Sequence, residues 1–169
     1  MKTIRLKLAI ALIINASLLT VAASPALAQG QSDKKAAKQE MKQLNKEANK
    51  TASKAEEVAD DLGRKAVFCI LAAHTSGVGT AAELKAKFDA LTGFPFGQFV
   101  AAVLLADRID MPLDEIIAKL VAGDSIGQIT KDADVNMGEV RSHFGQFRSE
   151  LARSQTNPPT KDCFKSTTP

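Results

Sequence analysis

The sequence predicts an all-α protein: a small orthogonal bundle of about six helices, preceded by a long helix rich in Lys and Ala. Apolar residues between positions 63 and 153 recur at spacings of three and four, the period of a helix, and no stretch forms a convincing strand. Capping residues and glycines stand between these runs. The chain therefore divides into residues 1–28, 29–62, 63–153 and 154–169.

Residues 1–28 have the composition of a secretory signal peptide. Basic residues precede an almost wholly apolar run over residues 8–23, and Ser24-Pro25 ends that run. The following Ala-Leu-Ala is a small-x-small site, which predicts cleavage between Ala28 and Gln29. The alternative is an uncleaved N-terminal anchor. We expect an exported protein, periplasmic or secreted, without a transmembrane segment in the mature chain, because no later apolar run is long enough to span a bilayer.

Removal of the signal changes the net charge. The full chain has 22 basic and 19 acidic residues, and three of the basic residues lie in the predicted signal. The mature chain is therefore neutral overall, and its net charge implies no polyanionic partner.

Residues 29–62 predict a Lys/Ala-rich helix, or a disordered segment that becomes helical on contact. Lysines recur every four residues from Lys38 to Lys54. A heptad seam runs beside them, made of Met41, Leu44, Ala48, Thr51, Ala55, Val58 and Leu62. One interpretation is a solvated helix that lies loosely on the core.

The other interpretation of this segment is a docking helix or a weak coiled coil. It makes Met41, Leu44, Val58 and Leu62 the docking positions and predicts weak self-association through residues 41–62. The seam is too poor in bulky residues to favour a role at a membrane surface.

The region 63–153 opens with three predicted helices. The first is the apolar stretch AVFCILAA at residues 66–73, which predicts a buried helix. Thr80 and Glu83 form a capping box that starts the second, and Gly93 closes it. Pro95 then introduces the most apolar helix of the mature chain, over residues 96–109, which we expect at the centre of the fold. Six phenylalanines lie on periodic apolar faces and indicate core packing rather than a ligand cage: Phe68, Phe88, Phe96, Phe99, Phe144 and Phe147.

Three further helices follow Pro112. Gly123 ends the first of them. Ser125 with Gln128 forms a capping box at the start of the second, and Asn136 with Glu139 repeats the device more weakly at the start of the third. A stripe of apolar residues at spacings of four, three and four then marks one face of the last helix: Val140, Phe144, Phe147 and Leu151.

Residues 113–147 resemble the helix-turn-helix unit of resolvase-like and homeodomain-like DNA-binding proteins. That pattern has a small residue, a glycine four positions later and a branched apolar residue six after that, and here the three positions hold Thr130, Asp134 and Val140. The turn Gly123-x-Ser125-x-x-x-Ile129 also resembles an uncharacterised group of secreted bacterial helical proteins, which implies the fold and no function. The alternative is a three-helix unit that packs its own core.

The charge of this unit argues against sequence-specific binding of nucleic acid. Residues 107–153 contain six basic and nine acidic side chains, a net charge of −3 on the surface that would face phosphates. In the first turn of the would-be recognition helix only Arg141 could make a bidentate contact with guanine, and Glu139 lies beside it.

The tail, residues 154–169, is polar and contains Pro158-Pro159, which predicts an extended segment. It carries Cys163, and the only other cysteine is Cys69 in the predicted buried helix. Two cysteines in an exported protein predict a disulfide bond, with two free thiols as the alternative.

No constellation of residues indicates chemistry. The only histidines are His74 and His143, and Cys69 lies five residues before His74, on a different side of a helix. We expect no metal, no cofactor and no enzymatic activity. The sequence therefore favours an exported, non-enzymatic helical protein that contacts a protein partner in the cell envelope or outside the cell, with the Lys-rich segment as the docking element. The alternative is a nucleic-acid-binding helix-turn-helix protein.

Overall fold

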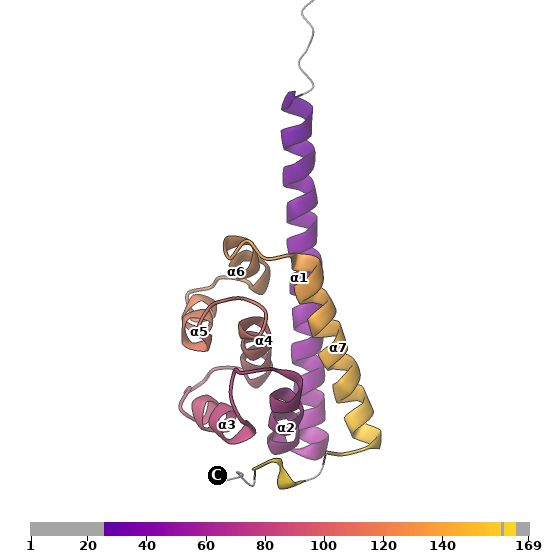
Figure 1. The fold of residues 1–169 in the computed structure, drawn as a ribbon, viewed down its shortest axis with the longest axis vertical. Helices are drawn as coiled ribbons and strands as arrows, with labels where there is room; N and C mark the ends of the chain where they lie inside the picture. Colours follow the sequence, from indigo (N-terminus) through magenta and orange to yellow (C-terminus); the bar gives the residue numbers. More distant parts are fainter. Residues whose placement is uncertain (1–25, 160, 165–169) are drawn as a thin grey trace, which may run out of the picture.

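The computed structural model describes residues 26–159 and 161–164, and over these residues the protein is all-helical with no strand (Figure 1). The fold class predicted from the sequence is confirmed, including the long first helix. The predicted signal peptide lies outside the described residues, apart from residues 26–28. The helices are α1 (Ala26–Leu62), α2 (Arg64–His74), α3 (Ala81–Asp89), α4 (Phe96–Ala106), α5 (Leu113–Val121), α6 (Ile126–Asp132), α7 (Met137–Thr156) and the short 3-10 turn η1 (Lys161–Phe164).

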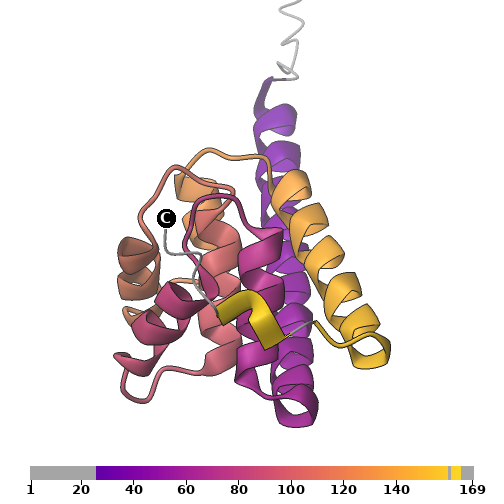
Figure 2. The same cartoon turned by 60° about the horizontal axis from the view of Figure 1, so that its bottom comes forward.

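Helix α1 is the longest element and runs through the whole molecule. Helix α7 lies along one side of it, and α2 to α6 gather on the other (Figures 1 and 2). The residues of α1 buried in the core are Leu44, Ala48, Thr51, Ala55, Val58 and Ala59, and the apolar ones share a single hydrophobic cluster with the later helices. The segment therefore does not lie loosely on a separate core, because it forms one wall of that core.

Helix α1 meets α4 and α6 at glycines. A Cβ on Gly97, in the first turn of α4, would lie 2.7 Å from the backbone oxygen of Ala52, and a Cβ on Gly127 in α6 would lie 2.9 Å from that of Met41. Side chains of α1 also accept hydrogen bonds from backbone N–H groups in the first turns of α4 and α6, which have no partner within their own helix. Glu56 accepts from the N–H of Gly97 at 2.8 Å.

Helix α4 lies at the centre of the bundle, as its apolar sequence predicts. Every residue from Phe96 to Leu105 is buried except Gln98. The six phenylalanines predicted to be core residues are all buried, and Phe68, Phe88, Phe96 and Phe99 pack against one another with ring centroids 5.3–6.2 Å apart.

The predicted caps set most helix starts. Thr80 and Glu83 form the complete capping box. Ser125 accepts from the N–H of Gln128, but the Gln128 amide donates to Asp132 instead of reaching back, so the second box is half-formed. Asn136 accepts from two N–H groups at the start of α7.

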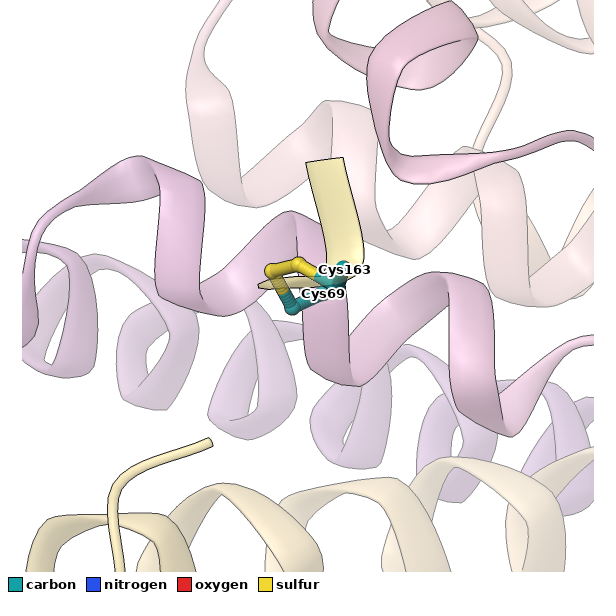
Figure 3. Close-up of a disulfide and its surroundings, with 2 residues drawn as sticks. All are labelled: Cys69 and Cys163. Carbon is teal, nitrogen blue, oxygen red and sulfur yellow. A yellow bond between two sulfur atoms is a disulfide. The ribbon is translucent and has the colours of Figure 1, made fainter. Parts of the chain in front are cut away.

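The tail returns to the bundle through the disulfide. Helix α7 continues to Thr156, slightly beyond the predicted boundary, and η1 then lies against α2 (Figure 2). Cys163 of η1 is joined to Cys69 of α2, with Cα atoms 5.7 Å apart and a sequence separation of 94 (Figure 3). The bond fixes η1 to α2, the first helix after α1, although the two elements are far apart in the sequence.

Candidate functional site

The lysines of α1 form a long run of positive charge on one helix. Residues 34–54 contain seven lysines and two glutamates, a net charge of +5. Residues 55–62 contain four acidic residues and no basic one. We call the set at intervals of four the lysine row: Lys34, Lys38, Lys42, Lys46, Lys50 and Lys54. It spans about 30 Å of helix, because an α-helix rises about 1.5 Å per residue.

The first part of the row lies on a helix end that projects from the bundle (Figure 1). Contacts with α6 begin at Met41 and Asn45, where the Asn45 amide donates to Ser125 and its oxygen accepts from Gly127. Before Met41 the described side chains are exposed, apart from a half-buried Ala37. This end is a bare helix that other parts of the described chain do not cover.

The second part of the row borders a shallow, open hollow along α1. Lys42, Lys46, Lys50 and Lys54 line it, together with Arg148 of α7. Lys50 and Lys54 lie 3.7 and 2.7 Å from Glu47 and Glu57.

The row also contains lysines without an acidic partner. Within the part of the chain whose side chains are described, no carboxylate lies within 4.0 Å of the ammonium groups of Lys38, Lys42 and Lys46. Their charges are available to a molecule from outside.

The predicted docking seam lies elsewhere on the same helix. Leu44 and Val58 are completely buried, and Met41 and Leu62 are half-buried. Leu44 and Val58 therefore belong to the core of the protein and are not free to bind a partner, which corrects the docking positions assigned from the sequence. Self-association through residues 41–62 stays a prediction, and the exposed face of that segment is the one that carries the lysines.

The segment that resembles a helix-turn-helix unit corresponds to α5, α6 and the start of α7. Thr130 and Val140 are buried, and the Thr130 hydroxyl donates to the carbonyl of Ile126. Asp134 has a φ of 54°, in the left-handed region. Arg141 donates to Gln43 of α1. A three-helix unit that only packs its own core would have the same features, so the resemblance to a helix-turn-helix unit stays a prediction.

The structure brings together two histidines that sequence analysis left apart. The rings of His74 in α2 and His143 in α7 stack with centroids 4.5 Å apart, although 68 residues separate them in the chain. The side chain of His143 is 2% exposed and that of His74 is 7% exposed. No sequence signal marks the pair, because the two histidines lie in different helices and neither local sequence indicates that these helices lie side by side.

Charged groups surround this histidine pair. An Arg108 guanidinium nitrogen donates to Nδ1 of His143 at 2.9 Å, and Nε2 of the same ring lies 3.3 Å from Asp107. His74 Nδ1 lies 2.9 Å from the Glu150 carboxylate. The Nε2 atoms of both rings are buried and lack a hydrogen bond of good geometry. Burial, followed by the nearby Arg108 and His74, lowers the pKa of His143 from 6.5 to about 4.

The described residues contain neither a metal-binding cluster nor a membrane-spanning helix. Among them, no group of three or more His, Cys, Asp or Glu side chains is placed to hold a metal ion. No helix in the described part of the chain has the length and apolar character needed to cross a membrane.

Comparisons with known proteins found no relative: no family model, no curated protein and no solved structure matches this chain.

Proposed function

We propose that the protein is exported and acts, without catalysing a reaction, by binding an acidic partner protein through the lysine row of α1. The observation that carries the proposal is the bare, projecting end of α1, together with Lys38, Lys42 and Lys46, which lack an acidic partner among the described residues. Ordering a long helix end costs conformational entropy. Contacts with a partner that covers this end would offset part of that cost.

The chemistry of the projecting end specifies the kind of contact. It consists mainly of Lys, Ala and Gln and has no aromatic side chain, so it offers charge and hydrogen bonds rather than apolar anchors. Such a surface fits carboxylates at intervals of about 6 Å, the spacing of every fourth residue on an acidic helix. Binding of this kind depends on electrostatic complementarity and weakens as salt is added.

Nucleic acid is the second candidate, and one observation favours it. Helix α7, whose first turn would be the recognition surface, lies beside the lysine row, with Arg148 in the same hollow as Lys42. Lysines could neutralise phosphates there, although α5 to α7 remain acidic overall. We expect only salt-sensitive binding without sequence preference, because side chains that could read bases are few.

The test is retention of envelope and extracellular proteins on the immobilised mature protein, eluted with a salt gradient. We expect an acidic protein to bind and then elute at moderate salt. A double charge reversal in the row, Lys38→Glu with Lys42→Glu, should abolish its retention.

The matched control reverses two exposed basic residues elsewhere, Lys131→Glu with Arg153→Glu, and so changes the net charge equally. Retention that survives reversal in the row, or that is lost equally in the control, would contradict docking through α1. Displacement of the bound protein by duplex DNA, together with a sequence-dependent DNA complex, would favour the second candidate.

The export part of the proposal has its own measurement. Mass spectrometry of the exported protein should show a chain that begins at Gln29. A chain that keeps Met1 and remains in the membrane would support the uncleaved anchor instead.

A further inference from the structure

The stacked histidines join three helices at one buried point. His74 is the last residue of α2, Asp107 and Arg108 follow the end of α4, and His143 and Glu150 lie on α7. The Ser76 N–H, just beyond α2, donates to Asp107 at 2.7 Å, and Phe147 packs 5.2 Å from the His74 ring. From α1, the Thr51 hydroxyl reaches the same stretch of α7 and donates to the carbonyl of Phe144.

The hydrogen bonds require His143 to be neutral. A guanidinium can only donate, so Nδ1 of His143 must accept from Arg108 and its proton must be on Nε2. Protonation of Nδ1 would place two donors against each other at 2.9 Å and add a charge beside Arg108. The Asp107 carboxylate opposes this repulsion, but it already accepts from Ser76 and lies 3.7 Å from Arg108.

We propose that the stack of His74 and His143 is an acid-sensitive contact that holds α7 against α2 and α4 at neutral pH and loosens α7 when His143 becomes charged. A charge on His143 would be buried and would be repelled by the Arg108 guanidinium, which lies 2.9 Å from its Nδ1. Release into water removes that cost, so acid favours a conformation in which α7 has moved away. Because α7 runs along α1, such a movement would also uncover part of the apolar seam that α7 helps to bury.

Proton NMR tests the proposal directly, since the chain has only two histidines. The ring signals of His143 should titrate well below pH 6.5, together with a loss of amide protection in α7. Protection of α7 amides, corrected for intrinsic exchange, should fall by about 100-fold between pH 7 and pH 4, because each pKa unit is a tenfold effect. The amides of α3, which do not contact the pair, should change much less. Titration of His143 near pH 6.5, or equal losses in α3 and α7, would overturn the proposal.

Two variants separate charge from packing. His143→Asn keeps an acceptor near the position of Nδ1 but stays neutral, so it should remove the extra acid sensitivity of α7. Arg108→Met removes a charge that opposes protonation of His143 in the packed state. The difference in His143 pKa between the packed and the released state then narrows, so the acid-induced loss of α7 protection should be smaller than in the wild type. Acid sensitivity that is unchanged in both variants would show that the stack is only a packing contact, and the wild-type titration decides the matter even if one variant does not fold.

Discussion

Single small residues decide how closely the helices approach. Gly97 allows the start of α4 to touch the backbone of α1, where even one extra carbon would lie 2.7 Å from the Ala52 oxygen. That oxygen belongs to a helix backbone and cannot swing away, so relief requires a shift of a whole helix. Gly145 in α7 differs, because a Cβ there would meet only the Glu47 side chain at 3.9 Å.

Gly97→Ala should therefore lower the free energy of unfolding by about 1–3 kcal/mol, the usual cost of overpacking. Gly145→Ala should raise it by about 0.5–1 kcal/mol, because alanine favours a helix interior over glycine. Urea denaturation of the two variants measures both effects. A loss of stability at Gly145 equal to that at Gly97 would show that close packing on α1 is not the cause.

The neutral His143 makes stability depend on pH. Its pKa is about 4 in the folded protein, against 6.5 for an unperturbed histidine. Between these values the unfolded chain binds a proton that the folded chain does not, so the unfolding free energy falls as the pH falls from about 6.5 to about 4. The full stabilisation is present above pH 6.5, and about 3 kcal/mol of it should be lost at pH 4.

Denaturation of wild type and His143→Asn at pH 7 and pH 4 isolates this contribution from that of the carboxylates. The wild type should lose more stability on acidification than the variant does. Equal losses in the two proteins would mean that His143 is not held neutral by the fold.

At the scale of elements, α1 supplies groups that the later helices lack. Pro95 precedes α4 and provides no side-chain cap, so the Glu56 carboxylate of α1 accepts from the Gly97 N–H instead. An acidic group at this helix start also interacts favourably with the helix dipole. The hydrogen bond from Gly97 to Glu56 therefore both caps α4 and holds α1 against it.

Glu56→Ala should lower the free energy of unfolding by about 1 kcal/mol, the typical cost of a lost N-terminal cap. Asp60→Ala, an exposed acidic residue one turn later, serves as the control and should change it by less than about 0.5 kcal/mol. Thermal or urea denaturation measures the difference. Equal effects would indicate that overall charge, rather than the cap, is responsible.

The sequence predicted the later helices better than it predicted the role of the first. Helical spacing, Thr80, Gly123 and the apolar run of α4 locate elements because they depend on local physics. The place of α1 depends on its partners: Ala48, Thr51 and Ala55 look like a poor seam, yet small residues are what close packing against other helices requires.

The histidine pair could not be predicted for a related reason. His74 and His143 meet only because α2 and α7 lie side by side, and nothing in either local sequence encodes that pairing. The spacing of the lysines could be read from the sequence. Only the structure shows that the first of them are exposed on a helix end that projects from the bundle.

At the scale of the whole molecule, the disulfide joins two distant parts of the chain, α2 and η1. It links the tail to α2 across 94 positions, and a cross-link of that span restricts the unfolded chain strongly. The double variant Cys69→Ala with Cys163→Ala should lose about 3–5 kcal/mol of unfolding free energy. Urea denaturation of the variant and the oxidised wild type measures this loss.

Non-reducing peptide mapping should find the Cys69–Cys163 pair in the exported protein. Two free thiols would contradict the bond. Equal stability of variant and wild type would contradict its contribution to the fold.

The molecule also distributes its charge unevenly. The predicted mature chain is neutral overall, but residues 34–54 carry a net charge of +5 and residues 107–153 a net charge of −3. An uneven charge distribution of this kind would steer the proposed acidic partner toward α1 and away from α5 and α6. Because α1 also forms a wall of the core, its deletion would remove the fold together with the surface, so tests of docking need point substitutions.

Site-specific photo-crosslinking in cells that export the protein tests docking through the lysine row most directly. A photoreactive residue at Gln39, exposed between Lys38 and Lys42, should give a discrete adduct with an acidic protein, whereas the same residue at exposed Ala86 in α3 should not. The adduct should disappear when Lys38→Glu and Lys42→Glu are introduced. No adduct at Gln39, or an adduct that persists after the charge reversal, would contradict the proposed docking surface.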